Sequence, residues 1–162
     1  MNIYQNKNVN KIKTLLIIFF ILSVSNCSLY SQNKPINGRV ISNQFDILPG
    51  VSIMINDTVE VGRTDLNGFF QIEMPVSVQK ILFRDIGLDP TIIELVDKCD
   101  EVEVVMMLSG TDDFITLKKV DRLRKKRFKK LPDFHKNAFE KGLFRTDKAC
   151  YIQEFMPWCK KN

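Results

Sequence analysis

Leu48-Pro49-Gly50-Val51 and Thr64-Asp65-Leu66-Asn67-Gly68-Phe69-Phe70 are the two stretches of sequence that predict the fold most clearly. Each combines a turn signature with the start of a short alternation of apolar and polar residues. Proline presets the backbone for a turn, and Asn-Gly accepts the left-handed conformation that a tight hairpin requires. Short strands separated by such turns predict a small antiparallel β domain rather than an α/β domain.

Period-two alternation continues on both sides of these turns. It places Val51, Ile53 and Ile55 on one face of a strand, as expected for a strand buried on one side. Six further runs have similar patterns and are separated by turn residues. The seven predicted strands are 36–41, 51–55, 59–63, 70–74, 78–83, 91–96 and 102–108. The fold prediction is therefore mainly β, a seven-stranded antiparallel β-sandwich over residues 32–110, followed by a basic α-helical extension over residues 111–162.

The first 31 residues have the pattern of a secretory signal peptide. Lys7, Lys11 and Lys13 precede an apolar run over residues 14–24, and small and polar residues follow. The run is shorter than the roughly 20 residues that a membrane span needs, although a signal-anchor remains an alternative. Cleavage before Asn26 or Gln32 and acylation of Cys27 as a lipoprotein all stay open. The pattern predicts export to the periplasm, the outer-membrane surface or the extracellular space.

The two halves of the remaining chain carry opposite charges. Residues 32–108 contain six basic and twelve acidic residues, a net charge of −6, whereas residues 109–162 contain fifteen basic and seven acidic residues, a net charge of +8. Such asymmetry indicates either an interaction tail or two parts of the chain that attract each other.

The basic segment changes to helical periodicity from Thr116 onward. Five apolar residues fall within an arc of about 140° at about 100° per residue: Leu117, Val120, Leu123, Phe128 and Leu131. Nine cations form the predicted basic interaction face: Lys118, Lys119, Arg122, Arg124, Lys125, Lys126, Arg127, Lys129 and Lys130. Pro132 is expected to end or kink this helix, and a second helix is expected from Asp133, as its cap, to Lys141, with Gly142 as its stop.

This cationic surface has several interpretations. The apolar stripe could dock on the acidic sandwich and leave the cations in solvent. Alternatively, the helix could bind an anionic membrane or glycolipid such as lipopolysaccharide, or an envelope protein. Nucleic acid is not expected as a partner of an exported protein, although the charge would suit it. The aromatic segment 144–158 indicates either the cap of a small core or a recognition surface.

Three cysteines follow the predicted signal peptide, and export would permit a disulfide. Cys150 and Cys159 are the candidate pair, closing a short loop worth roughly 2–3 kcal/mol in the chain-entropy model and leaving Cys99 unpaired. Three unpaired thiols are the alternative. No cysteine or histidine spacing suits zinc, and His135, the only histidine, is expected to be structural. We expect no catalytic residue, metal or cofactor.

Four motifs occur in the order found in carboxypeptidase regulatory-like domains. They are Ile36-Asn37-Gly38-Arg39-Val40, the two stretches quoted first, and Phe83-Arg84-Asp85-Ile86-Gly87. The chain resembles that family over roughly residues 34–108, although Leu88 replaces its usual aromatic residue. The resemblance implies a transthyretin-like sandwich of exported Bacteroidetes proteins, used as a non-catalytic module. The turn residues that carry the motifs are Pro49, Gly50, Asp65, Asn67, Gly68 and Gly87.

The sequence thus predicts a non-catalytic, exported cell-envelope protein. Its β-sandwich would act as a scaffold, and its basic extension would dock, tether or recruit a partner. A lipoprotein acylated at Cys27, with a helix that binds anionic membrane or lipopolysaccharide, is the alternative function. A remote alternative is a thiol enzyme that uses Cys150 or Cys159 as its nucleophile. No small-molecule substrate is predicted.

Overall fold

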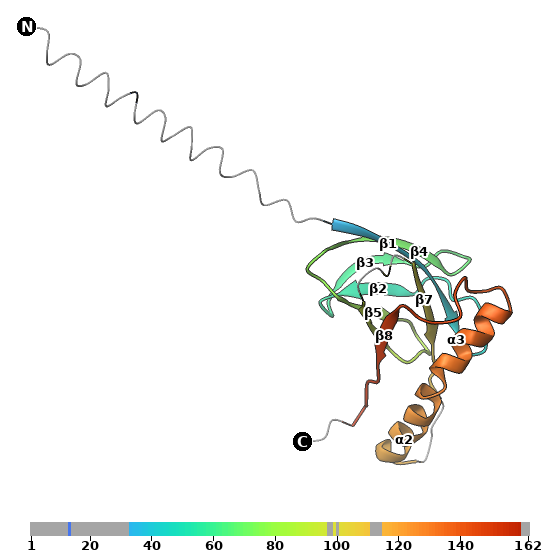
Figure 1. The fold of residues 1–162 in the computed structure, drawn as a ribbon. Coiled ribbons are helices and arrows are strands. Elements are labelled where there is room, and N and C mark those ends of the chain that lie inside the picture. Colours follow the sequence, from blue (N-terminus) through green and yellow to red (C-terminus); the bar gives the residue numbers. More distant parts are fainter. Residues whose placement is uncertain (1–12, 14–32, 97–98, 100, 111–114, 160–162) are drawn as a thin grey trace, which may run out of the picture. The chain divides into compact units, whose positions relative to one another are not determined.

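A computed structural model describes residues 13, 33–96, 99, 101–110 and 115–159 of the chain (Figure 1). The predicted signal peptide, apart from Lys13, and the candidate acylation site Cys27 lie outside the described residues. Asn33–Asn162 form one compact unit, so the predicted sandwich and the predicted extension fold together. Among the described helices, none is long and apolar enough to cross a membrane.

Two β-sheets form most of this unit. The first has the order β4 (Phe69–Pro75), β1 (Asn33–Ser42), β7 (Glu101–Met106). The second has the order β3 (Val59–Arg63), β2 (Ser52–Ile55), β5 (Lys80–Arg84), β6 (Thr91–Leu95), β8 (Tyr151–Glu154). All seven predicted strands are therefore present, within a few residues of their expected bounds.

The arrangement of the strands differs from the predicted seven-stranded antiparallel sandwich in two respects. Strand β1 pairs with β7 in parallel, so the first sheet is mixed. An eighth strand, β8, comes from the predicted extension and pairs antiparallel with β6. Alternation in the sequence shows which residues form strands but not the direction in which distant strands pair, because parallel pairs depend on long crossover connections.

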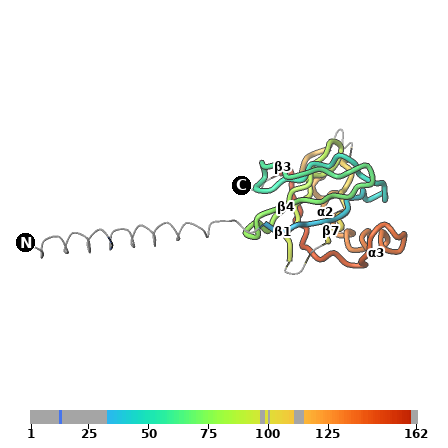
Figure 2. Tube along the Cα trace, turned by 90° about the horizontal axis from the view of Figure 1, so that it is seen from above, coloured from blue at the N-terminus to red at the C-terminus, as the bar shows by residue number. Residues whose placement is uncertain are grey.

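The alternating residues identified in the sequence form the core between the two sheets. Ile36 and Val40 of β1, like Ile53 of β2, are fully buried. The opposite face of the first sheet is covered by the C-terminal part of the chain, where Ile41 of β1 and Val105 of β7 belong to a second apolar cluster with Ala138. Figure 2 shows the helix that carries Ala138 beside β1 and β7.

The two sequence stretches that predicted the fold are bonded to each other. The Thr64 hydroxyl accepts a hydrogen bond from the amide of Val51 at 2.9 Å and donates one to the carbonyl of Leu48 at 2.7 Å. Asp65 Oδ1 accepts hydrogen bonds from the amides of Asn67 and Phe69, both at 2.8 Å. The Asp65 side chain therefore closes this turn by binding the amides that follow it.

The turn glycines provide a matched pair for a stability test. Gly50 and Gly68 have φ of 77° and 74°, where any other residue is strained by about 1–2 kcal/mol. A Cβ at Gly68 would lie 2.6 Å from the carbonyl oxygen of Val40, whereas one at Gly50 would meet nothing within 4 Å. In urea unfolding, we expect Gly50→Ala to lower the free energy of unfolding by about 1 kcal/mol and Gly68→Ala by about 3 kcal/mol. Equal losses would contradict the close approach at Gly68.

Two helices follow the strands, with bounds that differ from the prediction. Helix α2 covers Leu117–Phe128 and helix α3 covers Leu131–Glu140. Pro132 lies in the first turn of α3 instead of ending the preceding helix, and Asp133 is not the cap. A proline is tolerated there because the first amides of a helix have no partner within the helix. Gly142 adopts the left-handed conformation, with φ of 71°, as predicted for a helix stop.

The cysteine pairing also differs from the prediction. A disulfide joins Cys99 to Cys150, with their Cα atoms 5.4 Å apart, and Cys159 is unpaired among the described cysteines. The predicted Cys150–Cys159 bridge is therefore wrong. Cys99 lies just before β7 and Cys150 just before β8. The amide of Cys159, by contrast, donates a hydrogen bond to the Asp121 carboxylate of α2. Strand pairing, which sequence separation does not reveal, brings the two bridged residues together.

Candidate interaction surface

Helix α2 has a buried face whose centre is a charged residue. Val120 and Arg124 are buried on it, with 2% and 4% of their surfaces exposed. Leu117 and Leu123, which the apolar periodicity placed on the buried face, are 55% and 41% exposed. The helix is thus not held by the predicted apolar stripe alone.

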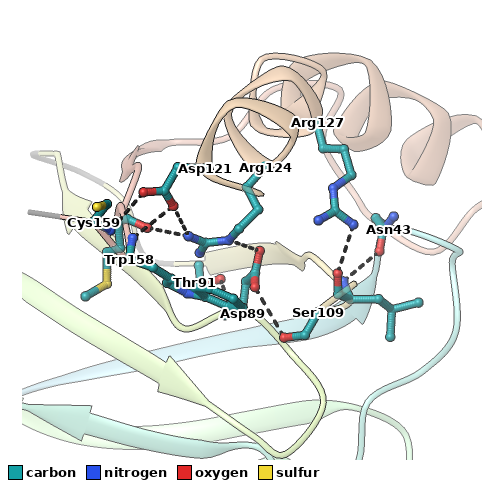
Figure 3. Close-up of polar contacts among 11 residues, drawn as sticks. Asn43, Asp89, Thr91, Ser109, Asp121, Arg124, Arg127, Trp158 and Cys159 are labelled. Carbon is teal, nitrogen blue, oxygen red and sulfur yellow. Dashed lines mark hydrogen bonds and ion pairs between the residues drawn. The ribbon is translucent and has the colours of Figure 1, made fainter. Parts of the chain in front are cut away.

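Arg124 connects α2 to the second sheet through a buried ion pair (Figure 3). Its Nε donates to Asp89 Oδ2 at 2.9 Å, and only 4% and 11% of the two side chains are exposed. Asp89 lies between β5 and β6, and its other carboxylate oxygen accepts a hydrogen bond from the Ser109 hydroxyl. Because a buried charge is stable only when it is paired, this contact fixes the position of the helix.

Asp121, one turn earlier on α2, ties the C-terminal segment to the same network. Its carboxylate accepts hydrogen bonds from Arg124 Nη1 at 3.1 Å and from the amides of Trp158 and Cys159 at 2.9 and 2.8 Å (Figure 3). Burial alone would raise the pKa of Asp121, but these three donors outweigh it and hold the pKa below its ordinary value.

Aromatic rings complete the surroundings of the Arg124 guanidinium. The guanidinium carbon lies 4.6 Å from the centre of the Trp158 ring and 5.5 Å from that of Phe155. Arg124 Nη1 also donates to the carbonyl of Met156 at 2.9 Å. The aromatic segment thus surrounds a buried cation on one side, while its earlier members Phe144 and Tyr151 are buried in the apolar clusters. The interpretation of this segment as a core cap is therefore supported for those two residues.

Two of the nine cations do not belong to the predicted basic face. Arg124 is buried, and Arg127 is half-buried. Arg127 donates a hydrogen bond to the carbonyl of Leu108 at 3.2 Å (Figure 3). The amide of Leu108 in turn donates to Asn43 Oδ1. The sequence offered the same signal for both residues, because at about 100° per residue Arg124 and Arg127 fall inside the predicted apolar arc. A cation in such an arc indicates a partner in the fold that accepts its hydrogen bonds.

The other seven cations remain exposed along one side of α2 and its C-terminal end. They are Lys118, Lys119, Arg122, Lys125, Lys126, Lys129 and Lys130. Those from Lys118 to Lys129 lie within an arc of about 120° at about 100° per residue. Among the described residues, none of the seven forms an ion pair, and the one carboxylate of α2, Asp121, is engaged by Arg124. We refer to these seven residues as the α2 basic face.

The comparisons with known proteins add no family assignment. No family model matches the chain, and a search of curated proteins finds no significant match. In the described part of the chain, no group of three or more His, Cys, Asp and Glu side chains is placed to hold a metal ion.

His135 is the one buried polar side chain in the described residues whose nitrogens both lack a hydrogen-bond partner. It is 4% exposed, and its ring centre lies 4.8 Å from that of Phe144. Burial lowers the pKa of His135, and the nearby Glu103 and Asp147 offset this only in part. The histidine is therefore held in its neutral form, with one nitrogen free to donate and one free to accept.

This lowered pKa predicts a loss of stability in mild acid. The unfolded chain binds a proton at His135 at higher pH than the folded chain does, so the free energy of unfolding falls as the pH drops below about 6.5. For a single proton, the free energy of unfolding can change by at most about 1.4 kcal/mol per pH unit. Urea unfolding between pH 7.5 and 5 measures it cleanly, because the chain has one histidine. A slope that persists unchanged in His135→Phe would contradict the assignment.

Proposed function

We propose that this chain is a non-catalytic, exported cell-envelope protein whose α2 basic face binds an anionic membrane surface. The β domain would be a scaffold of the carboxypeptidase regulatory-like kind. The α2 basic face carries this proposal, because its seven exposed cations, none of them ion-paired among the described residues, gather along one side and the end of a helix that is anchored from its other side. The disulfide is compatible with an oxidising compartment.

The buried anchor gives the basic face a fixed geometry. Arg124 and Asp121 hold α2 to the sheet and to the C-terminal segment, so the lysines project from a rigid support. A basic residue close to an anionic membrane contributes about 1 kcal/mol of attraction. Several such residues on one face provide reversible attachment, which weakens as salt screens the charges.

Acylation at Cys27 is an alternative form of the same attachment. Stable membrane anchoring generally needs two signals, such as one acyl chain and a polybasic surface, and the α2 basic face would supply the second. Cys27 lies six residues before the start of β1. Mass spectrometry of the mature amino terminus from the native envelope distinguishes an acylated cysteine from a cleaved, unmodified end.

Vesicle sedimentation tests the membrane proposal. A variant with Lys118→Gln, Arg122→Gln and Lys125→Gln removes three charges from the centre of the basic face. Its binding to phosphatidylglycerol vesicles is expected to fall roughly 100-fold, from about 1 kcal/mol per charge. The matched control, Lys34→Gln with Lys80→Gln and Arg84→Gln, removes the same residue types from the β domain and should retain binding. Equal losses in both variants, or binding that ignores salt, would contradict the proposal.

A further inference from the structure

A cavity of about 630 Å³ lies between the first turn of α3, residues 147–149, and side chains of β7 and β8. This volume is within the range of small-molecule sites, about 300–1,000 Å³. Most of the exposed surface inside it is apolar, provided by residues such as Val105, Phe128 and Leu131. Its residues come from segments far apart in the sequence, so the cavity exists only when the C-terminal part is folded onto the first sheet.

Among the described residues, the polar side chains on the buried side of this cavity have hydrogen-bond partners, except for His135. Tyr151 donates its hydroxyl hydrogen to the carbonyl of Glu103 at 2.8 Å, and the Glu103 carboxylate accepts hydrogen bonds from the amides of Arg145 and Thr146 and from the Thr146 hydroxyl. His135 lines the same cavity, and neither of its nitrogens has a partner among the described residues. Backbone groups of Asp147 and Glu103 lie close to the ring, but neither makes a well-formed hydrogen bond to it. A buried polar group left in this state is costly, which indicates a missing partner.

The rim of the cavity carries more positive than negative charge. Lys129, Lys136 and Lys148 line it, together with Asp133 and Asp147. Lys136 also lies 3.9 Å from Glu140 in an exposed pair, which contributes little in water. The five rim groups sum to a charge of +1, a balance that suits a monoanion.

We propose that this cavity binds a small amphiphilic monocarboxylate that carries a hydroxyl or carbonyl group on its apolar body. The carboxylate lies at the lysines of the rim, the hydrocarbon contacts Val105, Phe128 and Leu131, and the hydroxyl or carbonyl bonds to His135. This site is separate from membrane attachment by the α2 basic face, with which it shares only Lys129.

Three linear probes separate the contributions to binding. 10-Hydroxydecanoate carries both polar groups, decanoate lacks the hydroxyl group, and 1,10-decanediol lacks the charge. By calorimetry with the full chain, 10-hydroxydecanoate should bind in a saturable manner. Decanoate should bind about fivefold more weakly, and the diol about tenfold more weakly, since a hydrogen bond to a charged group contributes more than a neutral one.

Variants of the protein assign each contribution to its residues. In His135→Phe the preference for 10-hydroxydecanoate over decanoate should disappear, and in Lys136→Gln with Lys148→Gln the preference for the acid over the diol should disappear. Ala149→Trp, at an exposed position on the rim, should block all three probes. Near-ultraviolet circular dichroism checks that each variant is folded, and His135→Leu, which likewise cannot hydrogen-bond, replaces the phenylalanine variant if that one does not fold.

Two outcomes would overturn the proposal. One is that no probe binds the wild-type chain. The other is that the hydroxyl preference persists in the histidine variant, or that binding persists in Ala149→Trp, because either result would place the ligand elsewhere.

Discussion

Replacing Arg124 with methionine is expected to lower the free energy of unfolding by about 3–5 kcal/mol. Methionine fills a similar volume, but it leaves the Asp89 carboxylate buried without its cation and removes one of the donors to Asp121. Breaking a buried ion pair from one side is costly because the remaining charge loses both water and its partner. Urea unfolding monitored by far-ultraviolet circular dichroism measures the loss.

Lys125→Met is the matched control, since it removes a charge from the next position of the same helix. Lys125 is exposed and unpaired among the described residues, so this variant should change stability by no more than about 0.5 kcal/mol. The double variant Arg124→Met with Asp89→Asn should recover part of the loss, because the orphaned charge is removed as well. If Arg124→Met were as stable as Lys125→Met, α2 would not be anchored through the ion pair.

Removing the Cys99–Cys150 disulfide is the second change with a large expected effect. The bridged residues are separated by 51 positions, and the chain-entropy model assigns a loop of that length about 4 kcal/mol. The variant with both cysteines changed to alanine should lose about that much stability in urea unfolding. The bridge also joins the start of β7 to the start of β8, so β8 should lose protection from hydrogen exchange before β1 does.

The Cys99–Cys150 bridge and the Cys150–Cys159 bridge expected from the sequence predict different results for a change at Cys159. Cys159→Ala should leave stability almost unchanged, because Cys159 has no disulfide partner in the part of the chain that the structure describes. A peptide map of the non-reduced protein should show the peptide with Cys99 joined to the peptide with Cys150. A Cys150–Cys159 linkage in that map would contradict the structure and restore the pairing expected from sequence proximity.

Local patterns in the sequence predicted the positions of the strands but not their assembly. The alternation around Ile53 and the turn at Asp65 are properties of neighbouring residues, so they can be recognised without the fold. The parallel pairing of β1 with β7 depends on a connection of about 60 residues, on which alternation carries no information. Strand β8 was missed because apolar and polar residues do not alternate in it: Tyr151 and Ile152 are followed by Gln153 and Glu154.

The α2 basic face and its anchor show the same difference between local patterns and contacts across the fold. Exposed cations such as Lys118 and Lys125 were recognised because helical periodicity alone separates them from the buried face. The role of Arg124 depends on Asp89, 35 positions earlier, and a sequence does not show that these two residues meet. His135, in contrast, has no signal in the sequence, because the lack of partners for its nitrogens among the described residues results from packing among α3, β7 and the segment around Asp147.

The basic C-terminal part of the chain folds as part of the β domain and is not a free tail. Native-state hydrogen exchange of the disulfide-bonded protein is the decisive measurement. The amides of β8 and of the middle of α2 are expected to exchange as slowly as those of β6, to within about tenfold. If these amides exchanged at the rate of an unstructured chain while β1 and β4 stayed protected, the anchored basic face and the cavity would both be contradicted.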